Sequence, residues 1–229
     1  MQTLNLHNNT SIYNQCVVTI LHIDSNKSFS EYEKYLKFLS AEHQNRIFKY
    51  RRSEDRIRSM FARLLISYMA SSHFGLPIRM IEFEYGKYGK PFLKRNPEFQ
   101  FSFSHAFDRI ALVIDNNSIG IDIELVRSYD GRIAKRIFTH DEQTYLDTFD
   151  NREDIFFWIW TRKEAYIKES GMGMSCLLSS FSVLNRRNGF FYSMDVENYI
   201  VSVHTKKIFL YPPRLQIINI TELINNLFF

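Results

Sequence analysis

Four ionisable residues have types and spacings suited to metal and phosphate chemistry. Asp122 and Glu124 stand two apart, and Glu164 and Lys168 stand four apart further along the chain. Such pairs share one face of a strand and one face of a helix, respectively. Because Mg²⁺ takes a few carboxylates together with waters and phosphate oxygens, we predict that Asp122, Glu124 and Glu164 bind Mg²⁺ beside a pyrophosphate, with Lys168 as the adjacent cation. Taken singly, each residue is better explained by an exposed strand face or a surface ion pair.

Two further local groups are suited to binding an anion. Ser104 and His105 end a strand pattern, and a hydroxyl and an imidazole can donate hydrogen bonds to a phosphate. A core histidine explains this pair equally well. Gly89 allows a ligand to approach the backbone beside the charge of Lys90 and the ring of Pro91. A plain β-turn with a solvated lysine is the simpler interpretation of that segment.

A run of basic residues forms a turn and continues into the first long helix. Arg46 and Arg58 are candidates for binding a terminal phosphate, because a guanidinium group matches phosphate oxygens with paired hydrogen bonds. A solvated helix face explains the run equally well. Its members are Arg46, Lys49, Arg51, Arg52, Arg56, Arg58 and Arg63.

Composition limits the class of protein. The 229 residues are 45% hydrophobic and 16% aromatic, which is enough for one large core or two small ones. No apolar run is long enough to span a membrane, and residues 1–10 lack the pattern of a secretion signal, so we expect a soluble, cytoplasmic protein. Cys16 and Cys176 form no metal-binding or disulfide pattern and are expected to be reduced. The net charge of +4 is compatible with anionic partners.

Hydrophobic periodicity predicts an α+β protein made of two halves. The clearest elements are long helices over residues 53–74 and 152–170, which end at Gly75 and Gly171. We expect an N-terminal half over residues 1–115 and a C-terminal half over residues 116–229, packed tightly with the polar residues in the cleft between them. The other predicted helices cover residues 30–38, 131–138 and 141–148, and the predicted strands cover residues 17–23, 81–85, 99–105, 110–114, 118–124, 181–184, 190–196, 199–204 and 215–220.

Two motifs, in this order, resemble those of the Sfp-type 4′-phosphopantetheinyl transferases. The family motif G-I/V-D-I/V-E matches residues 120–124. The motif W-x-x-K-E-A-x-x-K matches residues 160–168 and is followed by Gly171 and Gly173, as in the family. Two matched motifs at the right separation are far more specific than either alone.

Upstream elements extend the resemblance through nearly the whole chain. The family element F-N-x-S-H matches residues 101–105, with serine in place of asparagine, and the G-K-P turn matches residues 89–91. Arg58 aligns with the arginine of the family's first long helix. The two basic positions near the first turn correspond to His43 and Arg46, and His43 would be only partly charged at neutral pH.

The resemblance implies two similar α+β halves related by a pseudo-twofold axis, with coenzyme A (CoA) and Mg²⁺ between them. Asp122, Glu124 and Glu164 would hold Mg²⁺ together with pyrophosphate oxygens of CoA. Lys168 would contact the phosphates, with Lys163 assisting nearby. The other implied contacts to the nucleotide and its 3′-phosphate are Arg46, Arg58, Gly89, Lys90, Pro91, Ser104 and His105.

The resemblance also implies a reaction. The serine hydroxyl of an apo acyl or peptidyl carrier protein would attack the β-phosphate of CoA, giving holo carrier protein and 3′,5′-ADP. Mg²⁺ and Lys168 would stabilise the developing charge. Glu164 is the first choice for the base that takes the serine proton, and Glu124 is the alternative.

The carrier protein is the second implied partner. Carriers of this kind are small, acidic helical bundles, and the positive net charge fits electrostatic steering toward them. Ile133, Ile137 and Phe138 are candidates for contact with the carrier, and the buried face of a short helix explains them equally well. One chain supplies both halves, so a monomer would suffice for one site.

Two other classes of function compete with this interpretation. A Mg²⁺-dependent nuclease also combines Asp, Glu and Lys, and a binding module would use the basic run on RNA or an acidic protein. The nuclease leaves the motif at residues 160–168 unexplained, and the binding module leaves the three carboxylates unexplained. We therefore expect CoA and a carrier protein as partners, with no nucleic acid and no membrane.

Overall fold

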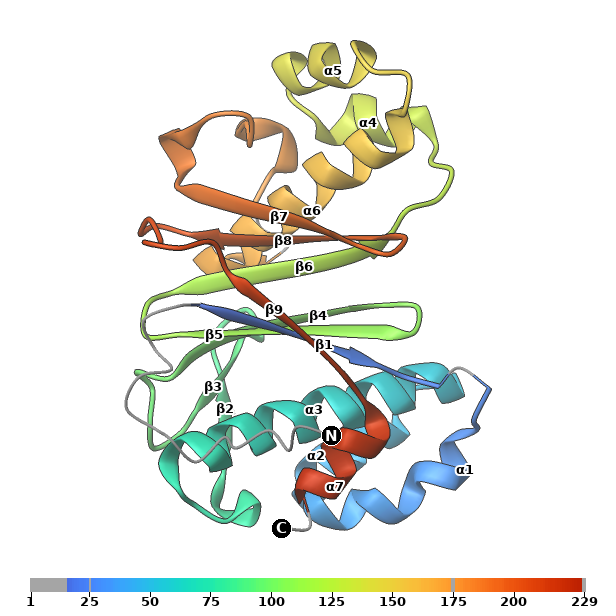
Figure 1. Ribbon diagram of the computed structural model, residues 1–229, viewed down its shortest axis with the longest axis vertical. Coiled ribbons are helices and arrows are strands. Elements are labelled where there is room, and N and C mark those ends of the chain that lie inside the picture. Colours follow the sequence, from blue (N-terminus) through green and yellow to red (C-terminus); the bar gives the residue numbers. More distant parts are fainter. Residues whose placement is uncertain (1–15, 25, 174–175, 228–229) are drawn as a thin grey trace.

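Two β-sheets stack face to face in the middle of the molecule, and helices cover their outer faces (Figure 1). The computed structural model describes residues 16–24, 26–173 and 176–227. Because successive side chains of a strand point to opposite faces, each sheet buries one face against the other sheet and the opposite face beneath helices. The fold is α+β, as predicted from the sequence.

The first sheet has the strand order β4-β5-β1-β9. β5 pairs antiparallel with both β4 and β1, whereas β9 pairs parallel with β1. The bounds are β1 Val17–His22, β4 Gln100–Ala106, β5 Arg109–Asp115 and β9 Arg214–Asn219.

The outer face of this sheet packs against a group of helices dominated by α3. Phe61 and Leu65 of α3 share one apolar core with Leu112 of β5 and Phe101 of β4. α3 has the bounds predicted from the sequence and ends at Gly75, whose φ of 62° is the left-handed conformation that favours glycine. The helices of this group are α1 Phe29–Tyr32, α2 Ala41–Phe48, α3 Ser53–Phe74 and α7 Ile220–Leu227.

The segment between β1 and α3 differs from its predicted form. The predicted helix over residues 30–38 is split into α1 and a 3-10 helix over Glu33–Phe38. α2 occupies the segment that the sequence pattern presented as a basic turn. It begins after Ser40, whose hydroxyl accepts a hydrogen bond from the backbone N–H of His43 and so caps the helix.

The second sheet has the strand order β6-β8-β7, with antiparallel pairing throughout. α6 runs along its outer face, and α4 and α5 lie beyond it (Figure 1). α6 has the bounds predicted from the sequence. The elements of this half are β6 Ile119–Leu125, β7 Phe190–Val196, β8 Tyr199–Thr205, α4 Gly131–Ile137, α5 His140–Asp147 and α6 Arg152–Ser170.

The predicted strand over residues 181–184 is wrong, because this segment is bent and irregular. Its backbone groups bond to side chains rather than to a neighbouring strand. The Val183 N–H donates to Glu142 (2.9 Å), and the Phe181 carbonyl accepts from Lys163 (2.6 Å). An alternating apolar pattern cannot distinguish these two ways of satisfying buried backbone groups.

The two sheets meet across an apolar core. Val18, Val113, Ile121 and Val203, one from each of four strands, lie in this core and are almost completely buried. The edge strands β4 and β6 are also joined directly, since Ser102 Oγ accepts a hydrogen bond from the Ile121 N–H at 3.1 Å. The halves therefore pack tightly, as the sequence suggested. Both cysteines are free thiols, as expected.

The C-terminal part of the chain crosses back to the first half. β9 joins the first sheet beside β1, and Leu223 of α7 is buried in the core around α3. Residues 214–227 therefore pack with the N-terminal half, although the division at residue 115 placed them in the C-terminal half. The crossing is visible in Figure 1, where β9 descends from the second sheet to α7.

A small two-stranded hairpin lies apart from the two main sheets. β2 (Phe83–Tyr85) pairs antiparallel with β3 (Pro91–Leu93) beside α3.

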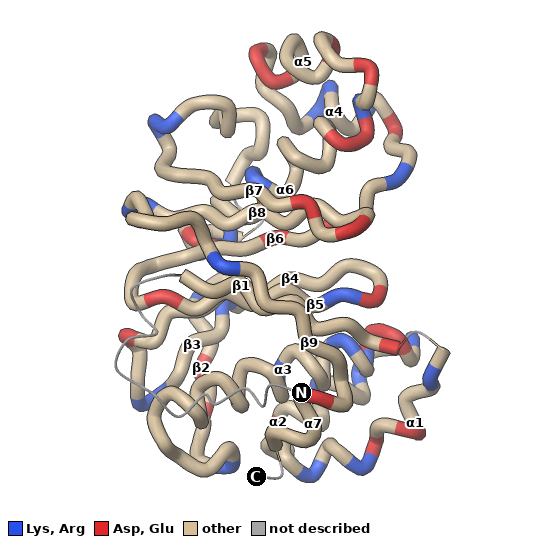
Figure 2. Tube along the Cα trace, viewed as in Figure 1, with Lys and Arg blue, Asp and Glu red and all other residues tan. Residues whose placement is uncertain are grey.

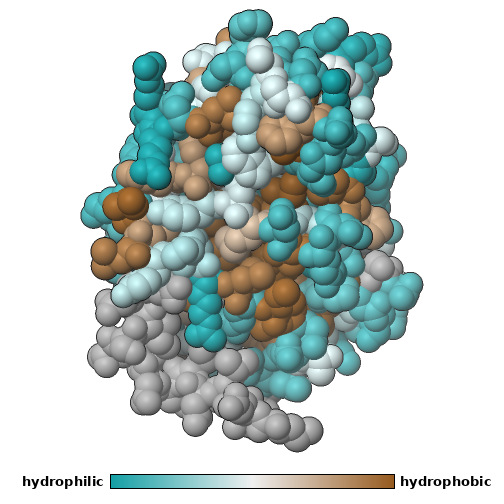
Figure 3. Space-filling model, turned by 45° about the horizontal axis from the view of Figure 1, so that its top comes forward, coloured by the Kyte–Doolittle hydropathy of each residue, from teal (hydrophilic) through white to brown (hydrophobic). Residues whose placement is uncertain are grey.

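Basic and acidic residues are interspersed on the surfaces of both halves in the view of Figure 2. Apolar surface crosses the middle of the face shown in Figure 3. None of the helices in the described part of the chain has the length and apolar character needed to cross a membrane.

Candidate active site

A cavity of about 580 Å³ lies between the two halves and is lined by residues of three of the four sequence motifs, but by none of residues 120–124. The turn around Gly89 and the strand β4 form one wall, and α6 with the segment after it forms the other. Its polar lining includes Lys90, Glu164 and Lys168. The lining residues are Tyr88, Gly89, Lys90, Pro91, Phe101, Ser102, Phe103, Trp160, Glu164, Ile167, Lys168, Gly171, Gly173, Cys176 and Leu178.

Gly120 allows β6 to lie directly against α6. A Cβ atom at this position would stand 1.9 Å from the Ala165 carbonyl oxygen and 2.5 Å from the Glu169 backbone nitrogen. No side chain fits there without moving the helix backbone. Because residues of a strand alternate, Asp122 and Glu124 share the face of Gly120 and point toward α6. The glycine of the first motif thus brings its carboxylates to the helix that carries the second motif.

Asp122 is the centre of a buried polar network. Its Oδ1 accepts a hydrogen bond from Ser104 Oγ at 2.7 Å and forms an ion pair with Lys168 Nζ at 2.7 Å. Lys168 Nζ also donates to Ser104 Oγ at 2.7 Å. The Asp122 residue is only 4% exposed. Its other oxygen, Oδ2, is buried and has no hydrogen-bond partner among the described residues.

The negative charge of Asp122 acts on the carboxylates of Glu124 and Glu164. Burial, followed by that charge, raises the pKa of Glu124 to about 7, although the Trp160 indole N–H donates to Glu124 Oε1 at 3.2 Å. Burial and the charge of Asp122 also raise the pKa of Glu164, while Lys168 opposes this shift. Burial first, and repulsion by Asp122 second, thus disfavour three ionised carboxylates in this cluster unless a further positive charge is present.

Within the described residues, no three His, Cys, Asp or Glu side chains stand as a ready-made metal site. The ion pair with Lys168 and the Trp160 hydrogen bond each engage one carboxylate oxygen. The donor set nevertheless fits Mg²⁺, because it consists of hard oxygen ligands, is deficient in positive charge, and includes Asp122 Oδ2, which has no partner in the described part of the chain.

Four of the residues predicted for the nucleotide and its 3′-phosphate lie outside the cavity lining, namely Arg46, Arg58, Ser104 and His105. Arg58 pairs with Asp55 at 2.6 Å and donates to the Phe107 carbonyl at 2.9 Å, which ties α3 to the β4-β5 turn. Arg46 pairs with Glu42 at 3.2 Å, and its guanidinium carbon lies 3.7 Å above the centre of the Tyr85 ring.

The two histidines near these arginines are biased toward the neutral form. Loss of solvation lowers the pKa of His105, and the charges of Arg58 and Lys168 lower it further. Burial lowers the pKa of His43 to about 4, assisted by Arg63. At neutral pH His43 is therefore uncharged, so it does not supply the second cation expected at that position.

Lys90 lies in the cavity wall and bridges the two halves. Its Nζ donates to the carbonyl oxygens of Glu169 at 3.2 Å and Ile119 at 3.4 Å. Burial lowers its pKa, while the charge of Glu169 opposes the shift. Lys90 thus has a structural role in addition to the predicted role near the nucleotide.

Lys163 is placed differently from its predicted role near CoA. Its side chain is completely buried and forms an ion pair with Glu142 Oε2 at 2.7 Å. Its Nζ also donates to the carbonyl oxygens of Leu178 at 2.8 Å and Phe181 at 2.6 Å. Its ammonium hydrogens are therefore already occupied, and it does not line the cavity. This geometry argues against contact between Lys163 and CoA.

Three contributing residues had no assigned role in the sequence. Trp160 orients Glu124, Ser102 joins β4 to β6, and Glu142 holds Lys163. Trp160 stood within a recognised motif, so its position was a usable signal. Glu142 also bonds the Thr139 N–H at the start of α5, and in the sequence it is indistinguishable from an ordinary helix cap.

Comparisons with known proteins agree with this geometry. The family model of the 4′-phosphopantetheinyl transferase superfamily matches residues 118–206, and that of the 4′-phosphopantetheinyl transferase N-terminal region matches residues 26–117. The 4′-phosphopantetheinyl transferase Sfp of Bacillus subtilis is 32% identical over 171 residues, covering 74% of this chain and 76% of the relative. The chain belongs to the 4′-phosphopantetheinyl transferase superfamily.

Two further matches, from other organisms, are also named as phosphopantetheinyl transferases. The 4′-phosphopantetheinyl transferase psf-1 of Bacillus pumilus is 32% identical over 169 residues, covering 73% of this chain and 72% of the relative. The L-aminoadipate-semialdehyde dehydrogenase-phosphopantetheinyl transferase of Candida glabrata is 27% identical over 165 residues, covering 68% of this chain and 63% of the relative. Membership of the phosphopantetheinyl transferase family accounts for both motifs, which the nuclease and binding-module interpretations did not.

Proposed function

We propose that this phosphopantetheinyl transferase moves the 4′-phosphopantetheine group of CoA to a serine of an apo acyl or peptidyl carrier protein, in a Mg²⁺-dependent reaction at the cavity between its halves. The observation that carries the proposal is the buried carboxylate of Asp122, which has one oxygen paired with Lys168 and the other without a partner among the described residues. Its partner Lys168 lines, together with Glu164, a cavity large enough for part of a nucleotide.

Asp122, Glu124 and Glu164 are the residues that would hold Mg²⁺. When bound, the ion would neutralise charge on the pyrophosphate oxygens. Trp160 orients Glu124 through its indole N–H, in the manner of the outer partners that fix metal ligands. Lys168 is held by Asp122 and Ser104 and so keeps a fixed positive charge at the cavity wall, where it favours charge developing on the transferred phosphate.

The reaction also requires a base near the cavity to take the proton from the hydroxyl of the carrier serine. Glu164 lines the cavity, and burial together with the charge of Asp122 raises its pKa. Because it lines the cavity, Glu164 is our first choice for the base, although a carboxylate that also holds Mg²⁺ is a weaker base. Glu124 is the alternative, since its pKa is raised for the same reasons.

Arg46, Arg58 and His105 are proposed to bind the 3′-phosphate of CoA. Both arginines now pair with carboxylates on their own helices, Glu42 and Asp55. A phosphate offers more acceptor oxygens and more negative charge than a carboxylate, so CoA would compete well for these guanidinium groups. Gly89, Lys90, Pro91 and Ser104 complete the proposed surface around the nucleotide.

The burial of three apolar residues limits which of them could contact the carrier protein. Phe138 is 2% exposed and belongs to the core of the second half, and Ile137 packs against the same core. Ile133 on α4 is 44% exposed and remains available for contact with a carrier. Since both walls of the cavity come from one chain, we propose that a monomer carries out the reaction.

A transfer assay tests the proposed function. The protein is incubated with CoA, Mg²⁺ and several apo carrier proteins, and the carrier is examined for the mass of added phosphopantetheine. We expect a mass increase that requires Mg²⁺ and is lost in the Asp122→Ala variant, which should remain folded by circular dichroism. No transfer to any carrier together with cleavage of DNA would overturn the proposal, and full activity of Asp122→Ala would refute the metal assignment.

A further inference from the structure

A cavity of about 400 Å³ lies in the second half, at the end of the sheet where β7 begins and β8 ends. The segment that leads into β7 and the segment that follows β8 supply much of its lining. It has no lining residue in common with the cavity between the halves. The residues used below are Arg162, Arg186, Phe190, Phe191, Tyr192 and Phe209, all of which line it.

Arg162 reaches this cavity from the side of α6 that faces away from the proposed active site. Successive residues of an α-helix are about 100° apart around its axis, so Arg162 points away from Trp160 and Glu164, two positions before and after it. Its Nε donates to Ser193 Oγ of β7 at 2.9 Å, and its Nη1 donates to the Val183 carbonyl at 3.3 Å. The guanidinium group is thus held between α6, β7 and the segment before β7.

The guanidinium group of Arg162 has no counter-ion in the described part of the chain. Burial lowers its pKa to about 10, and the opposing effect comes from Tyr145 rather than from a carboxylate. The group therefore remains charged at neutral pH. Its carbon lies 3.4 Å from the centre of the Trp158 ring, a contact that stabilises a cation without neutralising it. Buried charges in proteins are normally paired, so this arginine lacks an anion.

Nη2 of Arg162 is the donor that a ligand in the cavity could use. It has no hydrogen-bond partner among the described residues, whereas Nε and Nη1 are both engaged. It also keeps accessible surface, since it is not one of the fully enclosed unpartnered atoms. Its two hydrogens are therefore within reach of a ligand, and they need an acceptor oxygen.

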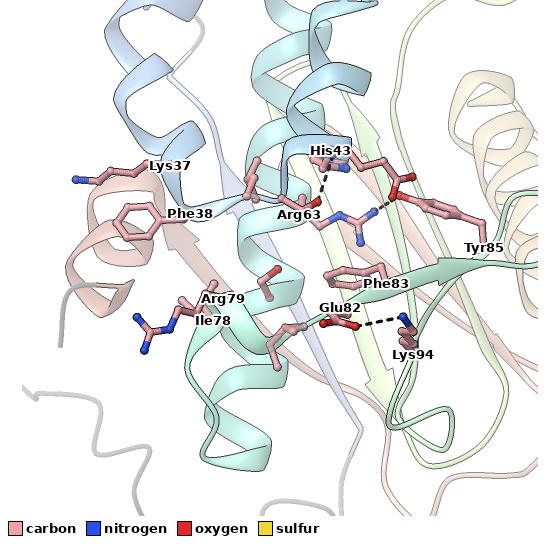
Figure 4. Close-up of a pocket in the computed structure, with 15 residues that line it drawn as sticks. Lys37, Phe38, His43, Arg63, Ile78, Arg79, Glu82, Phe83, Tyr85 and Lys94 are labelled. Atoms are coloured by element: carbon pink, nitrogen blue, oxygen red, sulfur yellow. Dashed lines mark hydrogen bonds and ion pairs between the residues drawn. The ribbon is translucent and has the colours of Figure 1, made fainter.

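The other charges of the lining also favour an anion. Arg186 lines the cavity and is exposed to solvent, and none of the described lining residues is Asp or Glu. The cavity of about 350 Å³ between α2, α3 and the β2-β3 hairpin differs in this respect, because its lining includes Glu82, which pairs with Lys94 at 3.5 Å (Figure 4). The positive charge beside β7 is therefore not balanced by the lining of its own cavity.

The remaining lining is mostly aromatic and limits the kind of anion that fits. The rings of Phe190, Phe191, Tyr192 and Phe209 line the cavity, and the centres of the Tyr192 and Phe209 rings lie 5.0 Å apart. A doubly charged phosphate would lose the water around several oxygens here and gain few donors in return. A carboxylate has one charge and two oxygens, and an apolar body attached to it would bury its surface against the rings.

We propose that this cavity binds a small organic acid, in which one carboxylate is attached to an apolar and preferably aromatic body. The carboxylate accepts a hydrogen bond from Nη2 of Arg162, Arg186 adds positive charge at the entrance, and the body packs against the four aromatic rings. The volume of about 400 Å³ lies within the range of small-molecule sites. The site is separate from the proposed CoA site, and binding there does not depend on transfer activity.

Isothermal titration calorimetry of the full chain tests the class of ligand. The probes are 3-phenylpropionate, its neutral amide, acetate and phenyl phosphate, all at matched ionic strength. We expect 3-phenylpropionate to bind at one site, and the amide to bind roughly 10–100-fold more weakly because it lacks the charge. Acetate lacks the apolar body and should bind at least roughly tenfold more weakly. Equal binding of the acid and the amide, tighter binding of phenyl phosphate, or no binding of the acid overturns the proposal.

A variant of Arg162 and a matched control test the binding residue. Arg162→Met keeps the length of the side chain and can still pack on Trp158, but it has no N–H to donate, so it should bind the acid no better than the amide. Arg187→Met, at an exposed arginine that does not line the cavity, is the control and should bind the acid as the wild type does. An undiminished preference for the acid in Arg162→Met overturns the proposal.

Photolabelling of the wild type locates the ligand, and it carries the test if Arg162→Met does not fold. The protein is irradiated with bound 3-(4-azidophenyl)propionate, digested and examined by mass spectrometry. We expect the label within residues 183–192 or 208–212, with labelling suppressed by excess 3-phenylpropionate and unchanged by saturating CoA. A label outside these two segments, or displacement of the ligand by CoA, would refute the site.

Discussion

Lys168 Nζ and Asp122 Oδ1 lie 2.7 Å apart, and Ser104 Oγ lies 2.7 Å from each of them. This triangle joins α6, β6 and β4, and therefore connects both halves at the proposed site. The triangle holds the ammonium group of Lys168 in a fixed position next to the carboxylates. Each of its three side chains, Lys168, Asp122 and Ser104, is bonded to the other two.

Replacing Lys168 by methionine tests the role of that charge. We expect Lys168→Met to lower kcat by roughly 10²–10³, the cost of removing one preorganised group that stabilises transition-state charge. Initial rates of carrier modification at saturating CoA and carrier provide the measurement. Lys207→Met, at an exposed lysine after β8, is the control and should keep the wild-type rate. A rate for Lys168→Met equal to that of the control would remove this lysine from the mechanism.

Trp160→Phe tests whether Glu124 acts as an oriented ligand. The variant keeps an aromatic ring but loses the N–H that donates to Glu124 Oε1. If Glu124 binds Mg²⁺, losing this outer partner should raise the Mg²⁺ concentration needed for half-maximal rate by about 10–100-fold, with less effect at saturating Mg²⁺. Trp158→Phe is the matched control. It makes the same substitution in the same helix, but Trp158 stacks with Arg162, whereas the bond to Glu124 comes from Trp160. An unchanged Mg²⁺ requirement in Trp160→Phe would separate Glu124 from the metal.

Gly120→Ala tests the close approach of β6 to α6. The new Cβ would meet two backbone atoms of α6, so the helix must shift, and we expect a loss of about 1–3 kcal/mol in the free energy of unfolding. Urea denaturation measures it. Gly131→Ala is the control, because nothing lies within 4 Å of its added Cβ. If the two substitutions have the same effect on stability, the contact is looser than the structure shows.

The sequence predicted the bounds of the helices and strands that carry the motifs better than it predicted the long-range contacts that hold these elements in place. The bounds of α3 and α6 follow from apolar residues three and four apart and from the closing glycines Gly75 and Gly171. The shared face of Asp122 and Glu124 follows from strand alternation alone. These features are local, so sequence periodicity contains them.

The features that the sequence did not predict depend on long-range contacts. Residues 181–184 have a strand-like pattern but bond to Glu142 and Lys163, which are distant in the sequence. β9 returns to the first sheet, and no local pattern specifies which sheet a strand joins. Lys163 belongs to a motif whose resemblance suggested a ligand contact, and only the fold shows its carboxylate partner.

The buried pair of Lys163 and Glu142 gives a stability prediction. Lys163→Met leaves the Glu142 carboxylate buried without its counter-charge, which should cost about 3–5 kcal/mol of unfolding free energy. The double variant Lys163→Met/Glu142→Gln should recover part of that loss, because no charge is then left unpaired. Urea denaturation of both single variants and the double variant measures the coupling. Lys135→Met, at an exposed lysine of α4, should have little effect. Strictly additive losses would contradict the pairing.

His43 gives a prediction about pH and stability. Burial, followed by the charges of Arg63 and Arg46, lowers its pKa in the folded protein to about 4, while an unfolded histidine has a pKa of about 6.5. As the pH falls below about 6.5, the unfolded state therefore takes up the proton first, and stability is lost progressively until about pH 4. The histidine should account for roughly 2–3 kcal/mol of that loss, and for none above pH 7.5.

His43→Gln removes the titrating ring and keeps an N–H for the Ser59 carbonyl. We expect its unfolding free energy to fall less steeply than that of the wild type between pH 6.5 and 4, as measured by urea denaturation at several pH values. His140→Gln, at an exposed histidine at the start of α5, should follow the wild-type curve. If the His43→Gln and wild-type curves run parallel over that interval, then the pKa of His43 in the folded protein is not lowered from its unfolded value.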